Sequence, residues 1–92
     1  MPVNTTGDRV FAEAFGISVR EARRRLRLSQ EALGELCHLD RTYISGVERG
    51  VRNPTVLSIW RIANALQVLP SELLREAERA VSAKGSASCR IR

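Results

Sequence analysis

Apolar residues recur at helical spacing along most of the chain, from about Val19 to Leu74. Residues three and four positions apart share one face of a helix, whereas a half-buried strand alternates every second residue. No segment of the sequence shows convincing strand alternation. The pattern therefore predicts an all-α fold of five helices.

The first predicted helix places Val19, Ala22 and Leu26 on its apolar face. Residues 1–14 form an N-terminal extension, in which Asp8 to Ala14 can extend this helix backward. The remaining surface of the helix carries Arg20, Arg23, Arg24 and Arg27. We expect these arginines to form a solvated face that attracts anions at long range.

Two short helices follow, and each begins at a residue type that caps helix N-termini. Ser29 caps the second helix, whose buried face we assign to Leu33 and Leu36, and this helix ends near Cys37. Asp40 caps the third helix, and Gly50 is its C-terminal stop. Ile44 and Val47 form the inward face of that third helix.

The connection between these two helices is short, because only His38, Leu39 and Asp40 are left to reverse the chain. Such a turn forces the helices to cross steeply and brings their backbones close together. Gly34 supplies the small residue that a close crossing needs, and Leu39 fills the apolar space beneath the turn. His38 occupies the position where we expect a left-handed backbone conformation.

The fourth helix follows a cap at Thr55, and Pro70 lies in the first turn of a fifth helix capped by Leu69 or Ser71. The apolar positions of the fourth helix are Val56, Ile59, Ile62, Ala63 and Leu66. Those of the fifth are Leu73, Leu74 and Ala77. Residues 82–92 have the composition of a flexible tail.

The 92 residues carry a net charge of +5, and arginine accounts for every basic residue except Lys84. This preference favours a phosphate or guanine partner, although genomic base composition explains it equally well. The sequence shows neither a membrane span nor a secretory signal, so we expect a cytoplasmic protein. The spacing of Cys37, His38 and Cys89 is not that of a metal site, so we expect neither a metal nor a cofactor. The two cysteines are expected to be reduced thiols.

Four short runs of sequence resemble the Cro and lambda-repressor-type helix-turn-helix family. They are Ser29-Gln30-Glu31-Ala32-Leu33-Gly34, Leu39-Asp40-Arg41-Thr42-Tyr43-Ile44-Ser45, Glu48-Arg49-Gly50 and Arg52-Asn53-Pro54. The resemblance extends from about Phe15 to Leu74, and the run from Leu39 to Arg49 is especially similar to controller proteins of restriction–modification systems. It implies a DNA-binding and dimerisation domain over residues 15–81. His38 and Gln67 stand where this family usually has glycine.

In that family the third helix enters the DNA major groove, although the same pattern is also that of a solvated amphipathic helix. The outward positions of the helix are Arg41, Thr42, Ser45, Gly46 and Arg49. We expect Arg41 to contact guanine, and Thr42 and Ser45 to contact bases. Gly46 would let the helix sit deeper in the groove.

The predicted phosphate contacts come from helix N-termini and from basic or polar side chains: Gln30, Tyr43, Arg49, Arg52 and Asn53. A base or minor-groove contact by Arg52 is the alternative that resemblance to controllers leaves open. Glu48 is expected to pair with an arginine, since phosphates repel a carboxylate.

Apolar surface beyond the needs of a small core predicts a homodimer interface made by Leu66, Leu69, Leu73 and Leu74. Trp60 belongs either to the core or to this interface. These features predict a homodimeric transcription regulator on a palindromic operator, with double-stranded DNA as its partner and RNA polymerase as a further candidate partner. No nucleophile, base or cofactor motif predicts an enzyme. The rival interpretation is an antitoxin or a helical protein-interaction module.

Overall fold

The computed structural model describes residues 6–83, and this part of the chain contains five α-helices and no strand. The helices are α1 (Thr6–Arg25), α2 (Gln30–Cys37), α3 (Arg41–Glu48), α4 (Val56–Ala65) and α5 (Pro70–Ala83). The all-α, five-helix prediction is confirmed. Helix α5 includes the first two residues of the predicted tail, whereas the rest of that tail, with Cys89, lies outside the described residues.

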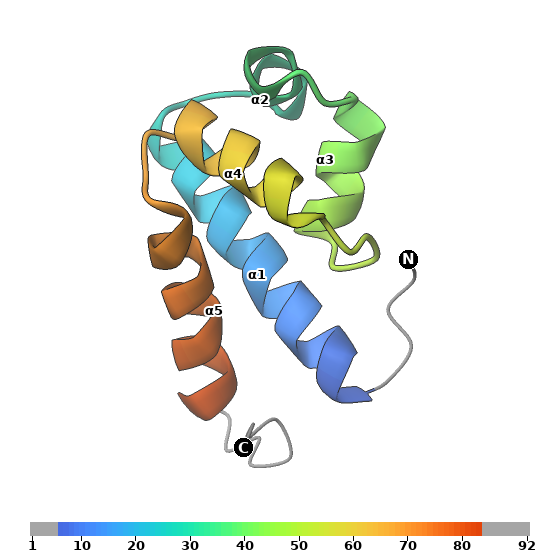
Figure 1. Ribbon diagram of the computed structural model, residues 1–92, viewed down its shortest axis with the longest axis vertical. Coiled ribbons are helices and arrows are strands. Elements are labelled where there is room, and N and C mark those ends of the chain that lie inside the picture. The colour runs from blue at the N-terminus through green and yellow to red at the C-terminus, as the bar shows by residue number, and fades with distance from the viewer. Residues whose placement is uncertain (1–5, 84–92) are drawn as a thin grey trace.

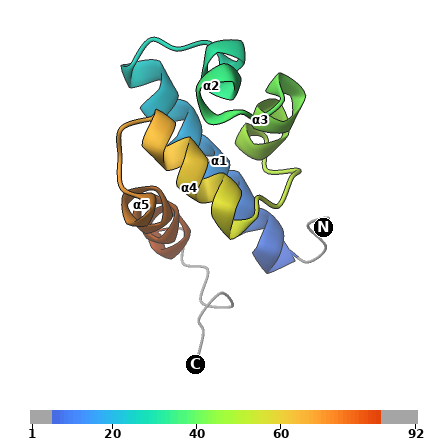
Figure 2. The ribbon, with the colours of Figure 1, turned by 45° about the horizontal axis from the view of Figure 1, so that its top comes forward.

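Two long helices, α1 and α5, lie side by side, and α4 crosses in front of α1 (Figure 1). The short helices α2 and α3 lie together on the other side of α4 from α5 (Figure 2). Helix α1 packs against both α5 and α3, while α2 packs against α3 and α4. This arrangement packs one face of α3 against the rest of the domain and leaves the opposite face of α3 exposed.

Helix α1 is longer than the periodic pattern around Val19 suggests, because it begins at Thr6 and runs without a break to Arg25. The backward extension through Asp8 to Ala14 is therefore confirmed. The prediction for Leu26 is wrong, since this side chain is 38% exposed. It lies past the end of the helix, where Arg27 turns the chain with a positive φ of 58°.

One apolar core holds the five helices together. Its most deeply buried members include Val19, Leu33, Ile44, Ile62 and Ala63. Leu36 and Val56 were expected in the core, but they are 57% and 81% exposed. On α2 the neighbouring helices cover the side that carries Leu33 and Cys37, so Leu36 faces outward. Val56 lies in the first turn of α4, before the helix reaches the core.

The predicted starts of the last two helices are confirmed by their hydrogen bonds. The Thr55 hydroxyl accepts from the Ser58 backbone N–H at 3.0 Å, which makes Thr55 the cap of α4. The Leu69 backbone N–H donates to the Glu72 carboxylate at 2.8 Å. Of the two candidates for the start of α5, Leu69 therefore precedes the helix, and Ser71 lies inside it.

The predicted dimer surface of four leucines needs correction. Leu66 and Leu73 are 2% and 3% exposed and lie within the core of this chain, so they are not available to a partner. Leu69 and Leu74 remain at the surface. The two most exposed large apolar side chains of residues 6–83, Val56 and Leu57, lie on α4. Trp60 on the same helix is 55% exposed and is therefore not a core residue.

Candidate nucleic-acid interface

The turn between α2 and α3 has the geometry that its residues predict. His38 adopts the left-handed conformation, with φ 59° and ψ 41°. The Leu39 N–H donates to the Gly34 carbonyl at 2.9 Å, and a Cβ atom on Gly34 would lie 2.5 Å from the Leu39 carbonyl oxygen. Only glycine leaves room for the backbone of the turn to lie this close to α2. This close contact fixes the angle at which α3 leaves α2.

The two helices of this motif begin at side-chain caps. The Ser29 hydroxyl accepts from the Ala32 N–H at 3.0 Å, and the Asp40 carboxylate accepts from the Thr42 N–H at 3.1 Å. The Thr42 hydroxyl also donates to Asp40. These hydrogen bonds favour the charged carboxylate, so they lower the pKa of Asp40. The predicted caps of α2 and α3 are confirmed.

Helix α3 presents a polar outer face and an apolar inner face. Ile44 and Val47 are buried, while Arg41, Thr42 and Arg49 are exposed. Ser45 is half-buried, so it is less exposed than Arg41 and Arg49. The structure thus brings the three proposed base-contacting residues, Arg41, Thr42 and Ser45, to one helix.

The prediction for Gly46 is wrong, because this residue is buried and not open to the groove side of α3. The side chain of Arg52 covers it: a Cβ atom on Gly46 would lie 2.4 Å from Cγ of Arg52. Arg52, which follows α3 in the chain, therefore folds back over the helix. Asn53 is exposed in the same connection between α3 and α4.

A small group of hydroxyls links α3 to the beginning of α4. The half-buried Tyr43 donates to the Ser58 hydroxyl at 3.4 Å, and the Thr55 hydroxyl donates to the same Ser58 oxygen at 3.0 Å. The sequence pattern predicts Thr55 only as a helix cap and predicts no role for Ser58. The contact of Ser58 with Tyr43 joins residues 15 positions apart, so no local pattern reveals it.

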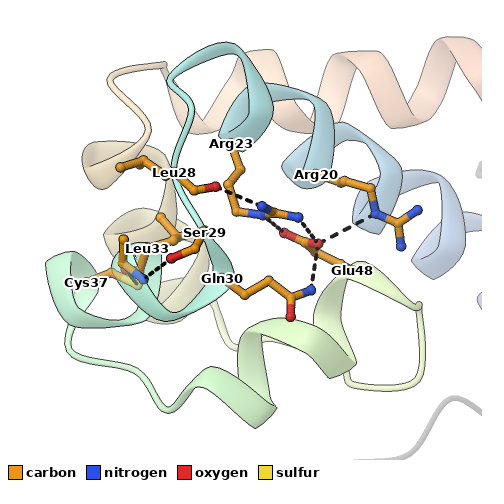
Figure 3. A network of polar contacts seen from close by, with 9 residues as sticks. Arg20, Arg23, Leu28, Ser29, Gln30, Leu33, Cys37 and Glu48 are labelled. Carbon is orange, nitrogen blue, oxygen red and sulfur yellow. Dashed lines mark hydrogen bonds and ion pairs between the residues drawn. The ribbon is translucent and has the colours of Figure 1, made fainter.

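The buried carboxylate of Glu48 ties the end of α3 to α1 and α2 (Figure 3). Arg23 donates to it through Nε at 2.6 Å and through Nη2 at 3.0 Å, and Gln30 donates through Nε2 at 3.0 Å. Arg20 lies 3.6 Å from the same carboxylate, and Arg23 also donates to the Leu28 carbonyl at 2.8 Å. The expected pairing of Glu48 with an arginine is confirmed.

This network corrects the interpretation of Arg23 as part of a solvated face, whereas Arg24 and Arg27 are exposed as expected. The Arg23 side chain is only 11% exposed, because it bonds inward to the fully buried carboxylate of Glu48. Burial by itself would raise the pKa of Glu48, but the hydrogen bonds from Arg23 and Gln30 and the nearby charges outweigh it and lower this pKa. Glu48 is therefore held as a charged group at neutral pH.

The described residues contain no group of three or more histidine, cysteine or acidic side chains placed to hold a metal ion. None of the helices between residues 6 and 83 is both long and apolar enough to span a membrane. Cys37 is a buried thiol that donates to the Leu33 carbonyl at 3.1 Å, and burial raises its pKa.

Comparisons with known proteins agree with this geometry. The helix-turn-helix family model matches residues 19–73. The chain is 48% identical over 61 residues to the control protein C.BamHI of Bacillus amyloliquefaciens, an alignment that covers 65% of this chain and 75% of that protein.

Solved structures show the same likeness. The restriction–modification controller protein C.AhdI of Aeromonas hydrophila has 47% identity and a TM-score of 0.67, over 67% of this chain and 94% of that one. C.Esp1396I bound to a 19 base pair DNA duplex has 30% identity and a TM-score of 0.69, over 77% of this chain and 95% of that one. The chain therefore belongs to the helix-turn-helix family, in the group that includes the restriction–modification controller proteins.

Proposed function

We propose that the protein is a transcription regulator that binds a specific DNA sequence by placing α3 in the major groove. The observation that carries this proposal is the outer face of α3, where Arg41, Thr42 and Arg49 are exposed. The opposite face of the helix is buried against the rest of the domain. A helix-turn-helix presents the N-terminal residues of this helix to the base edges. Similarity to C.Esp1396I, which has been solved on a DNA duplex, supports the same assignment.

Arg41 and Thr42, in the first turn of α3, are the main base-contacting residues of the proposal. The guanidinium of Arg41 matches O6 and N7 of guanine. The Thr42 hydroxyl proton is directed at Asp40, so Thr42 faces a base with its oxygen lone pairs or its methyl group. Ser45 is half-buried and has a short side chain, so it contacts a base only where the base lies close to α3.

Phosphate contacts surround this face. Arg49, Arg52 and Asn53 are exposed at the end of α3 and just beyond it. The hydroxyl of Tyr43 lies beside the N-terminus of α4, where backbone N–H groups and the helix dipole favour an anion. Gln30 uses one amide proton for Glu48 and keeps the other for a phosphate.

A homodimer would place two copies of α3 on the DNA together. We propose that the exposed apolar side chains of α4 meet a second copy, because Val56, Leu57 and Trp60 are 81%, 67% and 55% exposed. Leu69 and Leu74 are the members of the originally predicted interface that remain available to it. Two recognition helices about 34 Å apart match one turn of DNA and a palindromic operator.

We further propose that this regulator acts in the cytoplasm as a restriction–modification controller, the role that the names of its relatives give them. Its action on a promoter is regulatory and not enzymatic. It activates or represses by contacting RNA polymerase or by blocking its access to the promoter.

Selection from a random duplex pool tests the proposal and yields the operator in one experiment. We expect one enriched palindromic sequence, bound with an affinity that falls steeply as salt rises, because each phosphate contact releases about 0.9 counterions. Arg52→Ala should make this salt slope shallower. Arg79→Ala removes the same charge from α5 and should leave the slope unchanged. No enrichment and a flat salt response would reject DNA binding and favour the protein-interaction module.

Sedimentation of the protein without DNA tests the dimer separately. Trp60→Glu would bury an unpaired carboxylate in the proposed interface, so we expect a monomer. Ile17→Glu places the same charge at an exposed apolar residue of α1 and should leave a dimer. A wild-type monomer at micromolar concentration would overturn the dimer while leaving the choice of α3 intact.

A further inference from the structure

Arg20 lies on α1 beside the buried carboxylate of Glu48, but it makes no hydrogen bond to that group (Figure 3). Oε1 of Glu48 accepts from Nη2 of Arg23 and from Nε2 of Gln30, both at 3.0 Å, and Oε2 accepts from Nε of Arg23 at 2.6 Å. Nε of Arg20 is 3.6 Å from Oε1, which is too long for a hydrogen bond. Arg23 and Gln30 therefore satisfy the carboxylate, and Arg20 is a second cation beside it.

The charges of this cluster do not balance. Glu48 supplies a single negative charge, whereas Arg20 and Arg23 each carry a positive charge at neutral pH. The positions one helical turn away from Arg20 on α1 hold glycine, isoleucine and two arginines, so they offer no acidic side chain to pair with it. An excess positive charge therefore remains where α1 meets the end of α3 and the beginning of α2.

Arg20 lies next to residues that the proposed function assigns to phosphate contacts. It approaches the same Oε1 atom as Gln30, so these two side chains are neighbours. Arg49 follows Glu48 directly in the chain and is exposed. The side chain of Arg20 is itself 36% exposed, which leaves its guanidinium accessible to a ligand. Attraction to Glu48 also restrains the arginine before a ligand binds, and this restraint lowers the entropy cost of a contact.

We propose that Arg20 binds a backbone phosphate of the DNA, beside the phosphate contact proposed for Gln30. This inference rests on the proposed function and adds a contact from α1 to it. A guanidinium presents parallel N–H groups that match the oxygens of a phosphate, and the excess charge of the cluster attracts an anion. Phosphates carry no sequence information, so Arg20 strengthens binding to every duplex and helps to orient α3 on it.

The salt dependence of binding distinguishes a contact by Arg20 from long-range attraction by the arginines of α1. Arg20→Ala should reduce the slope of log affinity against log salt concentration by about 0.9 per subunit, on the selected operator and on a random duplex alike. Arg25→Ala is the matched control, because Arg25 is exposed on the same helix but lines a hollow between α1 and α5. It should leave the slope nearly unchanged. Equal changes in the two variants would overturn the inference.

Ethylation of single phosphates, which removes their negative charge, locates the contact on the selected operator. One ethylated phosphate in each half-site should weaken binding of the wild type and of Arg25→Ala, but should not weaken binding of Arg20→Ala any further. The phosphates contacted by Gln30 and by the residues after α3 should remain sensitive in all three proteins. An interference pattern that is the same in Arg20→Ala as in the wild type would overturn the inference.

Folding must be separated from binding in these variants. Arg20→Ala should unfold at nearly the urea concentration of the wild type, because Arg23 and Gln30 still donate to Glu48. Arg20→Gln keeps a polar side chain but removes the charge, so it should show the same loss of slope. A loss of affinity confined to the operator would assign Arg20 to a base and contradict the phosphate contact. A flat salt response of the wild type would reject the proposed function itself, whereas a steep response that Arg20→Ala does not change would reject this inference alone.

Discussion

The α2–α3 motif and the α1–α5 pair are built in different ways. Helices α2 and α3 have only 8 residues each and are held by directional contacts: two capping side chains, a left-handed turn and the Glu48 network. Helices α1 and α5 have 20 and 14 residues and supply buried apolar side chains such as Phe15, Val19, Leu73 and Ala77 to the core.

The difference follows from helix length and from the role proposed for each region. A helix of two turns is not stable alone. Helices α2 and α3 each add only two buried apolar side chains to the core, Leu33 and Cys37 from α2 and Ile44 and Val47 from α3. Hydrogen bonds and an ion pair also fix orientation more narrowly than apolar contact does. The α2–α3 motif should therefore respond to the loss of single polar groups, and the α1–α5 pair to the loss of side-chain volume.

The largest effect is expected at Glu48. Glu48→Ala leaves the buried guanidinium of Arg23 without its partner and should lower the free energy of unfolding by about 3–5 kcal/mol, measured by urea denaturation. Glu76→Ala is the control, because Glu76 forms an exposed pair with Arg79 on α5 that is worth about 0–1 kcal/mol. Equal losses in the two variants would remove the distinction between the regions.

Volume should matter most in the α1–α5 pair. Leu73→Ala creates a cavity in the core and should cost about 2–5 kcal/mol of unfolding free energy in thermal denaturation. Leu36→Ala removes the same atoms from a side chain that is 57% exposed and lies outside the proposed dimer interface, so it should cost far less. If Leu36→Ala were the more damaging of the two, the placement of these leucines would be contradicted.

Arg41→Ala should affect DNA binding and leave folding unchanged, because Arg41 is exposed and lies outside both the core and the Glu48 network. We expect a loss of about 1–3 kcal/mol in affinity for the selected operator and a much smaller loss on random DNA. Titrations of both duplexes check this. Equal weakening on the two would assign Arg41 to a phosphate instead of a base.

Loss of a single cap should cost less than loss of the buried ion pair. Ser29→Ala removes the acceptor of the Ala32 N–H and should lower the unfolding free energy by about 1 kcal/mol, measured in urea. Ser71→Ala is the matched control, since Ser71 is exposed within α5 and does not precede a helix. A neutral Ser29→Ala would show that packing alone holds α2 in place.

Acid should weaken the α2–α3 motif by a smaller and graded amount. Glu48 and Asp40 have lowered pKa values in the folded protein, so the unfolded chain takes up more protons as the pH falls. Their contribution to stability is complete above the ordinary carboxyl pKa of about 4 and is lost as the pH falls through the lower folded values. Unfolding at several pH values should show a shallower acid dependence in Glu48→Ala than in the wild type.

Local features of the fold could be predicted well from the sequence. The caps at Ser29, Asp40 and Thr55 and the left-handed conformation of His38 are all as expected. Each depends on hydrogen bonds or sterics within about five residues of chain, so the residue types involved are sufficient evidence. The same holds for Gly34, whose neighbour Leu39 is near in sequence as well as in space.

The tertiary structure decided which side of each helix is covered and what each charged side chain contacts. Apolar spacing could not separate Leu66 and Leu73, which are buried, from Leu36 and Val56, which are exposed, because burial depends on the helix that packs alongside. Charge could not separate Arg23, which bonds inward to Glu48, from the exposed Arg24. The sequence by itself thus determined where helices begin, end and turn, since those choices are local. The contact of Arg23 with Glu48 joins residues 25 positions apart, so it exists only once distant turns of the chain are brought together.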